Sequence, residues 1–164
     1  MIPFGKENYV INLWESSKAK IGKWMQGQLL LGVLIFILVY LGLTIFGLPY
    51  ALTLALLAGL MEIIPVFGPI MAAIPAILLA LSTGGMSLAL IIAGFYLLVQ
   101  QFESNLIYPL VVRKVVGVPP ILVILSLIIG YELAGFLGIL ISVPVAAAVM
   151  ELVDDIEKQK GVTA

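Results

Sequence analysis

The chain has 164 residues, of which 63% are hydrophobic and 10% charged, with a mean hydropathy of +1.24. Soluble domains average roughly 45–50% apolar and about 25% charged residues, so this composition is typical of a membrane protein. The net charge of −1 provides no basic surface for nucleic acid. Histidine and cysteine are both absent, which excludes disulfides, zinc clusters and thiol chemistry. We expect no metal centre and no cofactor.

Nothing in the sequence supports an enzymatic function. There is no Gly-rich phosphate loop and no Gly-x-Ser-x-Gly nucleophile motif. An intramembrane aspartyl protease would need two aspartates within the membrane, but Asp154 and Asp155 are the only aspartates and are adjacent in the charged tail. We therefore predict that the chain is not an enzyme.

The first 47 residues predict how the chain enters the membrane. Residues 1–26 combine apolar and aromatic side chains with Lys18, Lys20 and Lys23, which is typical either of an amphipathic surface helix or of a linker with an aromatic anchor. Residues 27–47 form an apolar run long enough to cross a hydrocarbon core of about 30 Å. Because the lysines precede this span, we expect residues 1–26 on the cytoplasmic side of a multi-pass protein in the cytoplasmic (inner) membrane.

Proline and glycine interrupt the apolar sequence that follows. Residues 62–69 hold one acid, two prolines and a glycine between two uncharged runs, and neither run of residues 48–82 is as long as an ordinary span. Lipid cannot satisfy the backbone carbonyls that such a break exposes, so the break must lie in protein, in a wet cavity or at the membrane surface. This pattern predicts a helical hairpin.

The predicted fold is an all-α membrane protein with two long transmembrane helices, each followed by a Pro/Gly-broken helical hairpin. The parts of the transmembrane domain at 27–153 are a span at 27–47, a hairpin at 48–82, a span at 86–108 and a hairpin at 118–153, before a charged tail at 154–164. A shift of 70 residues lays Glu62 on Glu132 and Gly68 on Gly138, which indicates an internal repeat or a chance match of two Leu-rich segments. The hairpins either cross the membrane fully or re-enter it with their tips at mid-membrane.

Polar side chains within the apolar part are the candidates for a substrate or ion path: Glu62, Gln101, Glu103, Asn105 and Glu132. Carboxylates supply hydrogen-bond acceptors, while amides supply donors and acceptors, for hydroxyl groups or a cation. A carboxyl group desolvated there would bind a proton more readily, which would permit proton coupling. The structural alternative is that these residues join helices or meet headgroup water at a helix end.

Spacing and backbone breaks complete the predicted site. Gln100 and Glu103 are three residues apart, and Gln101 and Asn105 are four apart, so each pair shares a helix face. Short segments interrupted by glycine and proline at corresponding positions are the sequence sign of a transporter binding site. The residues expected to shape these breaks are Pro65, Gly68, Pro69, Pro109 and Pro144.

Several motifs in order resemble the autoinducer-2 exporter (AI-2E) family: Glu62-x-Ile64-Pro65-x-x-Gly68-Pro69, Ile74-Pro75-Ala76, Gln101-x-Glu103-x-Asn105-x-Ile107-x-Pro109, and Gly135-x-x-Gly138 with Val143-Pro144. Family members usually carry further transmembrane helices before this part, so the chain resembles their C-terminal half. The resemblance implies a homo-oligomeric membrane transporter. Glu62 resembles a family position where asparagine also occurs, and Tyr108 stands where some exporters carry an acid before the proline.

The expected function is membrane transport of a small hydrophilic solute, as the resemblance implies for AI-2E permeases. Two alternatives stay open: sodium/proton antiport by the same fold, which the resemblance also implies, and a non-transporting membrane subunit or scaffold. The expected partners are the lipid bilayer, a small hydrophilic solute or cation, and further copies of the chain, with no nucleic acid.

Overall fold

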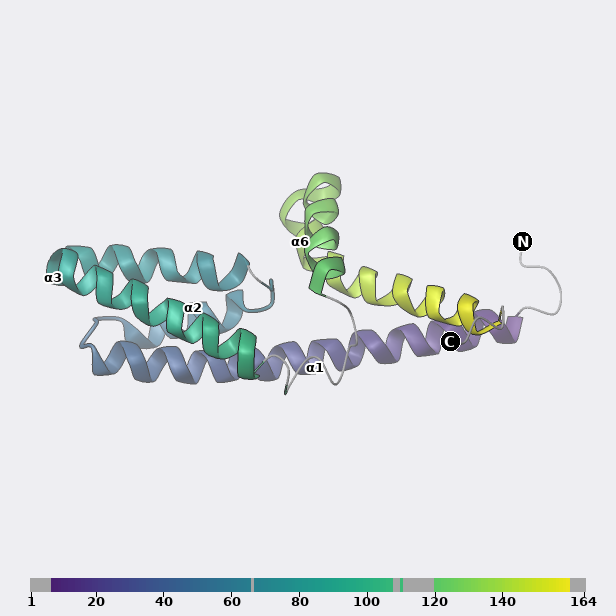
Figure 1. The fold of residues 1–164 in the computed structure, drawn as a ribbon, viewed down its shortest axis with the longest axis horizontal. Helices are drawn as coiled ribbons and strands as arrows, with labels where there is room; N and C mark the ends of the chain where they lie inside the picture. The colour runs from purple at the N-terminus through teal and green to yellow at the C-terminus, as the bar shows by residue number, and fades with distance from the viewer. Residues whose placement is uncertain (1–6, 66, 108–109, 111–119, 160–164) are drawn as a thin grey trace. The chain divides into compact units, whose positions relative to one another are not determined.

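The structure, a computed structural model, describes residues 7–65, 67–107, 110 and 120–159 (Figure 1). Its elements are α1 (Glu7–Ile45), α2 (Ala51–Met61), α3 (Phe67–Phe102), the π-helix η1 (Glu103–Ile107) and α6 (Pro120–Gln159). Three helical stretches are long and apolar enough to cross a membrane: Ile21–Ile45, Phe67–Ile107 and Ile121–Met150. The prediction of an all-α membrane protein is therefore confirmed.

The chain divides into two compact units, which we describe separately. One consists of Gly27–Lys114, and the other of Met1–Gln26 with Val115–Ala164. Helix α1 runs without interruption from Glu7 to Ile45. The predicted surface helix, from Glu7 onward, and the first predicted span therefore belong to the same helix.

Helix α1 ends at a glycine with left-handed backbone. Gly47 has φ 69°, its amide donates to the Thr44 carbonyl at 3.0 Å, and the Leu48 amide donates to the Leu43 carbonyl at 2.9 Å. These two hydrogen bonds form the Schellman motif, which satisfies the last carbonyls of a helix. The chain can therefore reverse here and enter α2 within a few residues.

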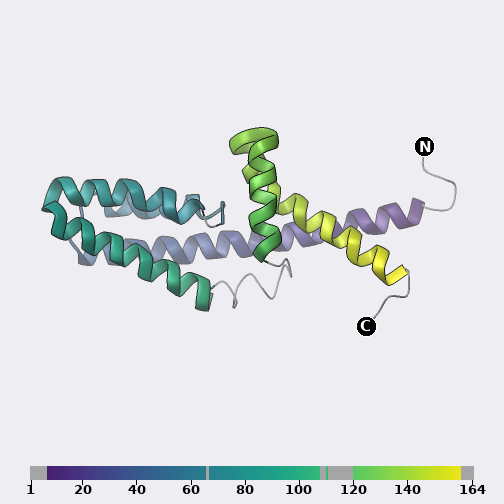
Figure 2. The same cartoon turned by 45° about the horizontal axis from the view of Figure 1, so that its top comes forward.

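Helix α3 consists of two arms joined at Gly85, which has φ 69° and ψ −166°. We call residues 67–84 its first arm and residues 86–102 its second arm. The two arms lie alongside α2 and the latter part of α1 (Figures 1 and 2). This turn lies in the gap between the predicted hairpin at 48–82 and the predicted span at 86–108.

The core of the 27–114 unit is built from side chains repeating every four residues. In α1 these are Leu31, Ile35, Val39 and Leu43, and in the first arm of α3 they are Ala72, Ala76 and Ala80, all at most 3% exposed. A four-residue repeat places side chains on one face of a helix. Helix α3 packs against α2, and the alanines add little bulk to the buried face of its first arm. The opposite faces remain apolar and exposed, as expected for contact with lipid.

Two glycines bring α1 and α2 into backbone contact. A Cβ added at Gly32 would lie 2.6 Å from the Gly59 carbonyl oxygen, and a Cβ added at Gly59 would lie 2.7 Å from the Gly32 carbonyl oxygen. Small residues at helix interfaces permit such close approach in membranes, where van der Waals packing drives association. This crossing places α2 beside the first turns of the apolar part of α1.

Replacing Gly85 by alanine should destabilise the 27–114 unit by about 1–3 kcal/mol, because its backbone angles belong to a region open almost only to glycine. The site has free space, so the cost comes from the backbone and not from a clash. Unfolding of the detergent-solubilised chain by SDS titration measures the change. The matched control is Gly94→Ala, at a helical glycine with open space, which should leave stability unchanged or raise it by about 0.5–1 kcal/mol. Equal effects at the two sites would contradict the assignment of the turn.

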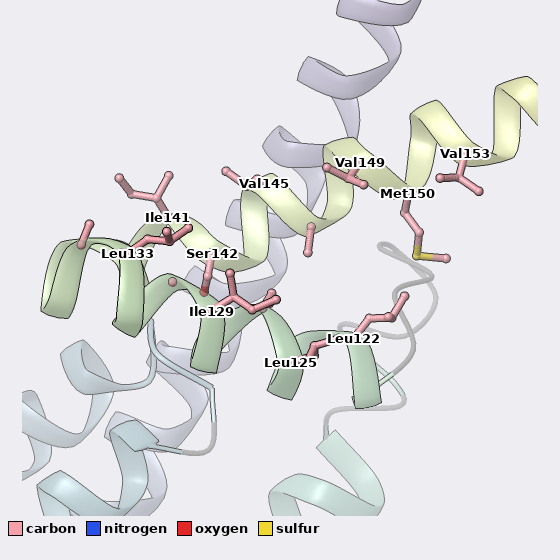
Figure 3. A pocket seen from close by; sticks show the side chains of 15 residues that line it. Leu122, Leu125, Ile129, Leu133, Ile141, Ser142, Val145, Val149, Met150 and Val153 are labelled. Atoms are coloured by element: carbon pink, nitrogen blue, oxygen red, sulfur yellow. The ribbon is translucent and has the colours of Figure 1, made fainter.

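Helix α6 is itself a hairpin. The backbone of Ala134 and Gly135 is not helical, and the chain turns there. The two arms cross at Gly130 and Gly138, where a Cβ added to either glycine would overlap the carbonyl oxygen of the other. Beyond this crossing the arms enclose a groove of about 590 Å³ (Figure 3). Its two serines, Ser126 and Ser142, donate their hydroxyl groups to carbonyls of their own helix at 2.8 Å and 2.7 Å. The groove therefore presents an apolar lining without free hydroxyl donors.

Candidate functional site

Residues 24–112 contain only two charged side chains, Glu62 and Glu103, and no basic residue. Both are buried, with exposed fractions of 1% and 6%. They come from different elements, because Glu62 follows α2 and Glu103 begins η1. A buried charge is costly unless it is paired, so two acids brought together without a basic partner need a specific explanation.

Glu62 is held at the C-terminal end of α2 by backbone hydrogen bonds. Its amide donates to the Ala58 carbonyl at 3.1 Å, and the Ile64 amide donates to the Met61 carbonyl at 3.0 Å. The side-chain amide nitrogen of Gln28 donates to the Glu62 carbonyl oxygen. The tip of the hairpin formed by α2 and the first arm of α3 is thus fastened to α1.

The start of α3 packs directly against the end of α2. The Gly68 amide donates to the Ile64 carbonyl at 2.8 Å, and a Cβ at Gly68 would overlap the Met61 carbonyl oxygen. Pro65 and Pro69 flank this contact and are half-buried. Three of the predicted backbone-break residues therefore lie together at the tip that carries Glu62.

Glu103 begins the π-helical turn that ends α3. The widened turn keeps Glu103 and Ile107 buried, and such π-turns are frequent at functional sites. The Gln100 amide nitrogen donates to a Glu103 carboxylate oxygen at 3.3 Å. The carboxyl groups of Glu103 and Glu62 lie close enough for their charges to influence each other, although no hydrogen bond within 3.5 Å joins them. The end of α3 and the tip of the hairpin therefore form one buried acidic site, which we call the Glu62–Glu103 pair.

This site holds several buried acceptor atoms that no donor reaches. Among the described residues, both carboxylate oxygens of Glu62 and the amide oxygen of Gln28 are buried and lack a hydrogen-bond partner. Most buried polar atoms in proteins have a partner, so an unpaired group points to an unseen ligand or ion, or to stored strain. Here three such atoms occur on two residues that are joined by a hydrogen bond.

The other predicted path residues lie elsewhere. Gln101 and Asn105 are exposed and bonded to each other, with the Asn105 amide nitrogen 3.0 Å from the Gln101 amide oxygen. Glu132 is exposed near the turn of α6, and Pro144 is half-buried within the same helix. Pro109 lies outside the described residues. The structure thus buries Glu62 and Glu103 and leaves Gln101, Asn105 and Glu132 exposed.

Gln28 was missed in the sequence. It stands at the beginning of the apolar run of 27–47, where a polar residue at the membrane surface is ordinary. Its burial to 3% exposed and its bond to the hairpin tip depend on a contact with a residue 34 positions later in the chain. No local pattern carries that information.

Comparisons with known proteins agree with this membrane architecture. The chain is 33% identical over 127 residues to YrrI of Bacillus subtilis, and the matched segment covers 77% of this chain and 36% of YrrI. It is 32% identical over 149 residues to YueF of the same organism, covering 91% and 40%, and 39% identical over 106 residues to MT0215 of Mycobacterium tuberculosis, covering 65% and 29%. All three are named as candidate transport proteins.

The matched part is a fraction of these relatives. The chain spans no more than 40% of the length of each of the three. Residues 1–158 match the sequence profile of the AI-2E transporter family, which is nearly the whole chain. The chain therefore belongs to the AI-2E transporter family.

Proposed function

We propose that this chain forms part of a transport path for a small hydrophilic solute across the cytoplasmic membrane, and that the Glu62–Glu103 pair marks that path. The observation that carries the proposal is that the only charged side chains of residues 24–112, Glu62 and Glu103, are both buried in the interior of an apolar unit. Ionisable residues in membrane segments are costly and rare, and they usually serve a solute or an ion.

The lengths of the α3 arms favour the fully crossing version of the first hairpin. The first arm, residues 67–84, has 18 residues, and the second arm, residues 86–102, has 17. At 1.5 Å per residue each arm covers about 26 Å of a hydrocarbon core of about 30 Å. The tip is bonded to Gln28 at the start of the apolar part of α1. In this proposal the tip lies near the cytoplasmic surface, where the Glu62–Glu103 pair would form the inner mouth of the path.

Single cysteines should report the depth of the tip, because the natural chain has none. Cysteine at Ile63, an exposed tip residue, should react with an impermeant thiol reagent from the cytoplasmic side. Cysteine at Leu97, which is exposed within the second arm and faces lipid in this proposal, is the matched control and should stay unlabelled. Protection of Ile63→Cys from both sides would favour the re-entrant version, in which the tip lies at mid-membrane.

The proposal assigns a different role to the exposed polar residues Gln101, Asn105 and Glu132. These residues would face solute or further subunits, because exposed polar side chains are unfavourable against lipid. A homo-oligomer would cover such residues between copies. Cross-linking of Gln101→Cys chains into defined oligomers in native membranes would support this arrangement.

The transport test uses vesicles that contain the purified chain. Glycerol and ribitol are suitable probes, because the carboxylate and amide groups of the site match hydroxyl groups. The rate of solute entry, followed by light scattering, should exceed that of empty vesicles and fall at least about 10-fold in Glu62→Gln and Glu103→Gln, equivalent to about 1.4 kcal/mol. Glu15→Gln removes an exposed acid and should transport like the natural chain.

Two other functions remain as outcomes of this test. Sodium/proton antiport is favoured by the presence of two buried acids without a basic partner, and sodium-driven pH changes inside the vesicles would reveal it. Stable oligomers that carry neither solute nor ion would identify a membrane scaffold.

A further inference from the structure

A buried tyrosine in the second arm of α3 has a hydroxyl group without a partner. The side chain of Tyr96 is 7% exposed, and its hydroxyl oxygen is buried without a hydrogen bond to any residue that the structure describes. A buried tyrosine usually gives its hydroxyl group a partner, and a buried donor left unpaired destabilises the fold. Such a hydroxyl group therefore points to a water molecule or a ligand as its partner.

Tyr96 shares a helix face with the acid at the end of α3. Tyr96, Gln100 and Glu103 follow one another at spacings of four and three residues, which place side chains in one row along a helix. Within this row the Gln100 amide nitrogen donates to the Glu103 carboxylate at 3.3 Å. The same face continues toward the turn of α3 with Ile92 and Ala89, which are both buried. At 1.5 Å per residue, Tyr96 lies about 10 Å from Glu103 along the second arm.

Aromatic packing holds the Tyr96 ring in place. The ring of the neighbouring Phe95 lies edge-on to the Tyr96 ring, with 5.9 Å between the centroids, and edge-on to the Phe46 ring at 5.5 Å. Edge-to-face pairs are a favourable aromatic geometry. The Phe95 ring also rests on Gly42 of α1, where an added Cβ would overlap it. The second arm is therefore fixed to α1 beside Tyr96, and packing rather than a hydrogen bond positions the hydroxyl group.

The chemistry of this position suits a neutral partner. A tyrosine hydroxyl group is both a donor and an acceptor, so it can form hydrogen bonds in either direction with another hydroxyl group. It carries no charge, and residues 86–102 contain no charged side chain. An ion beside Tyr96 would find no counter-charge on this arm, and an unpaired charge inside a membrane is costly. A water molecule or the hydroxyl group of a neutral solute meets no such cost.

We propose that Tyr96 is a solute-contacting residue of the transport path, where its hydroxyl group binds a hydroxyl group of the passing neutral solute about 10 Å beyond Glu103. The proposal rests on the proposed function in taking the interior of the 27–114 unit as the path. The row of Tyr96, Gln100 and Glu103 then forms one polar side of that path.

Hydroxyl-radical footprinting of the whole chain in detergent tests whether this position holds water and solute. The radicals form from water in an X-ray beam, so they modify side chains that touch water, including buried ones. Tyr96 should be modified more than Tyr40, which is exposed on the apolar part of α1 and faces detergent in this arrangement. Ribitol should lower the modification of Tyr96 relative to that of Tyr50, an exposed residue that corrects for radicals consumed by ribitol. A Tyr96 that stays unmodified, or that ribitol does not protect, would overturn the proposal.

Tyr96→Phe removes only the hydroxyl group and separates a role in transport from a role in folding. Entry of ribitol into vesicles should slow about 2- to 10-fold, the range expected for loss of one hydrogen bond. The melting temperature should stay the same or rise, because an unpaired buried group is removed. Tyr40→Phe, which removes the hydroxyl group of an exposed tyrosine, should alter neither quantity. A lower melting temperature in Tyr96→Phe would reveal a partner within the protein, and ribitol entry as fast as in a transporting natural chain would exclude solute contact.

The solute contact and the transport function fail separately in these experiments. A natural chain that moves no ribitol, but in which ribitol protects Tyr96, would contradict transport and support the solute contact. A chain that moves ribitol while Tyr96 stays unprotected would support transport and overturn the solute contact.

Discussion

Replacing both Glu62 and Glu103 by glutamine should stabilise the 27–114 unit by about 1–3 kcal/mol, while transport is lost. Glutamine keeps the shape of each side chain and removes two charges that are buried at 1% and 6% exposed without a basic residue in the same stretch. Burial of unpaired charge is among the largest destabilising terms in a protein interior. Stability and activity should therefore change in opposite directions.

Unfolding by SDS titration in choline chloride measures the stability, and the vesicle assay measures transport. The control is Glu15→Gln, which removes an exposed acid and should change neither quantity. The single variants should each show part of the gain, since removing either acid relieves the repulsion. A double variant less stable than the natural chain would mean that the carboxylates make stabilising contacts, and would contradict the picture of an uncompensated pair.

Replacing Gly68 by alanine should destabilise the same unit by about 1–3 kcal/mol, the usual cost of forcing extra atoms into a packed interior. The added Cβ would overlap the Met61 carbonyl oxygen, which is backbone and cannot rotate away as a side chain could. The first turn of α3 would have to separate from the end of α2, and the Gly68–Ile64 hydrogen bond of 2.8 Å would weaken. Since Glu62 directly follows α2 at this contact, transport should fall together with stability.

The control for Gly68→Ala is Gly22→Ala, where nothing lies within 4 Å of the added Cβ. That variant should be as stable as the natural chain or slightly more stable, because alanine favours helix. Thermal unfolding of both proteins in the same detergent provides the comparison. If Gly68→Ala unfolds like Gly22→Ala, the hairpin tip is looser than the contact indicates.

Much of the fold could be predicted from local sequence. Composition identifies the membrane class, and the breaks at residues 62–69, at Gly85 and near Gly135 follow from glycine and proline in otherwise apolar runs. The pairs Gln100–Glu103 and Gln101–Asn105 are both hydrogen-bonded, as their spacing predicts. These features depend on neighbours within a few residues, which is the range that helix periodicity describes.

The composition of the site could be predicted only in part. Glu62 and Glu103 were candidates because acids are rare in apolar segments, but their meeting depends on how three helices pack. Gln28 joins them through a contact across 34 residues. The π-helical turn at η1 keeps Glu103 buried while Asn105 remains exposed, and helix spacing alone does not predict where an extra residue enters a turn.

The crossing in α6 separates the distance between its two arms from the shape of the groove between them, two properties that side chains usually control together. Gly130 and Gly138 touch through their backbones, so no side chain sets the distance between the arms at that point. The groove beyond them is lined by ordinary apolar side chains such as Leu122, Ile129 and Val149 (Figure 3). Mutation can therefore change the shape of the groove while its width at the crossing stays fixed. This freedom would let related chains accept different apolar contacts on an unchanged hairpin.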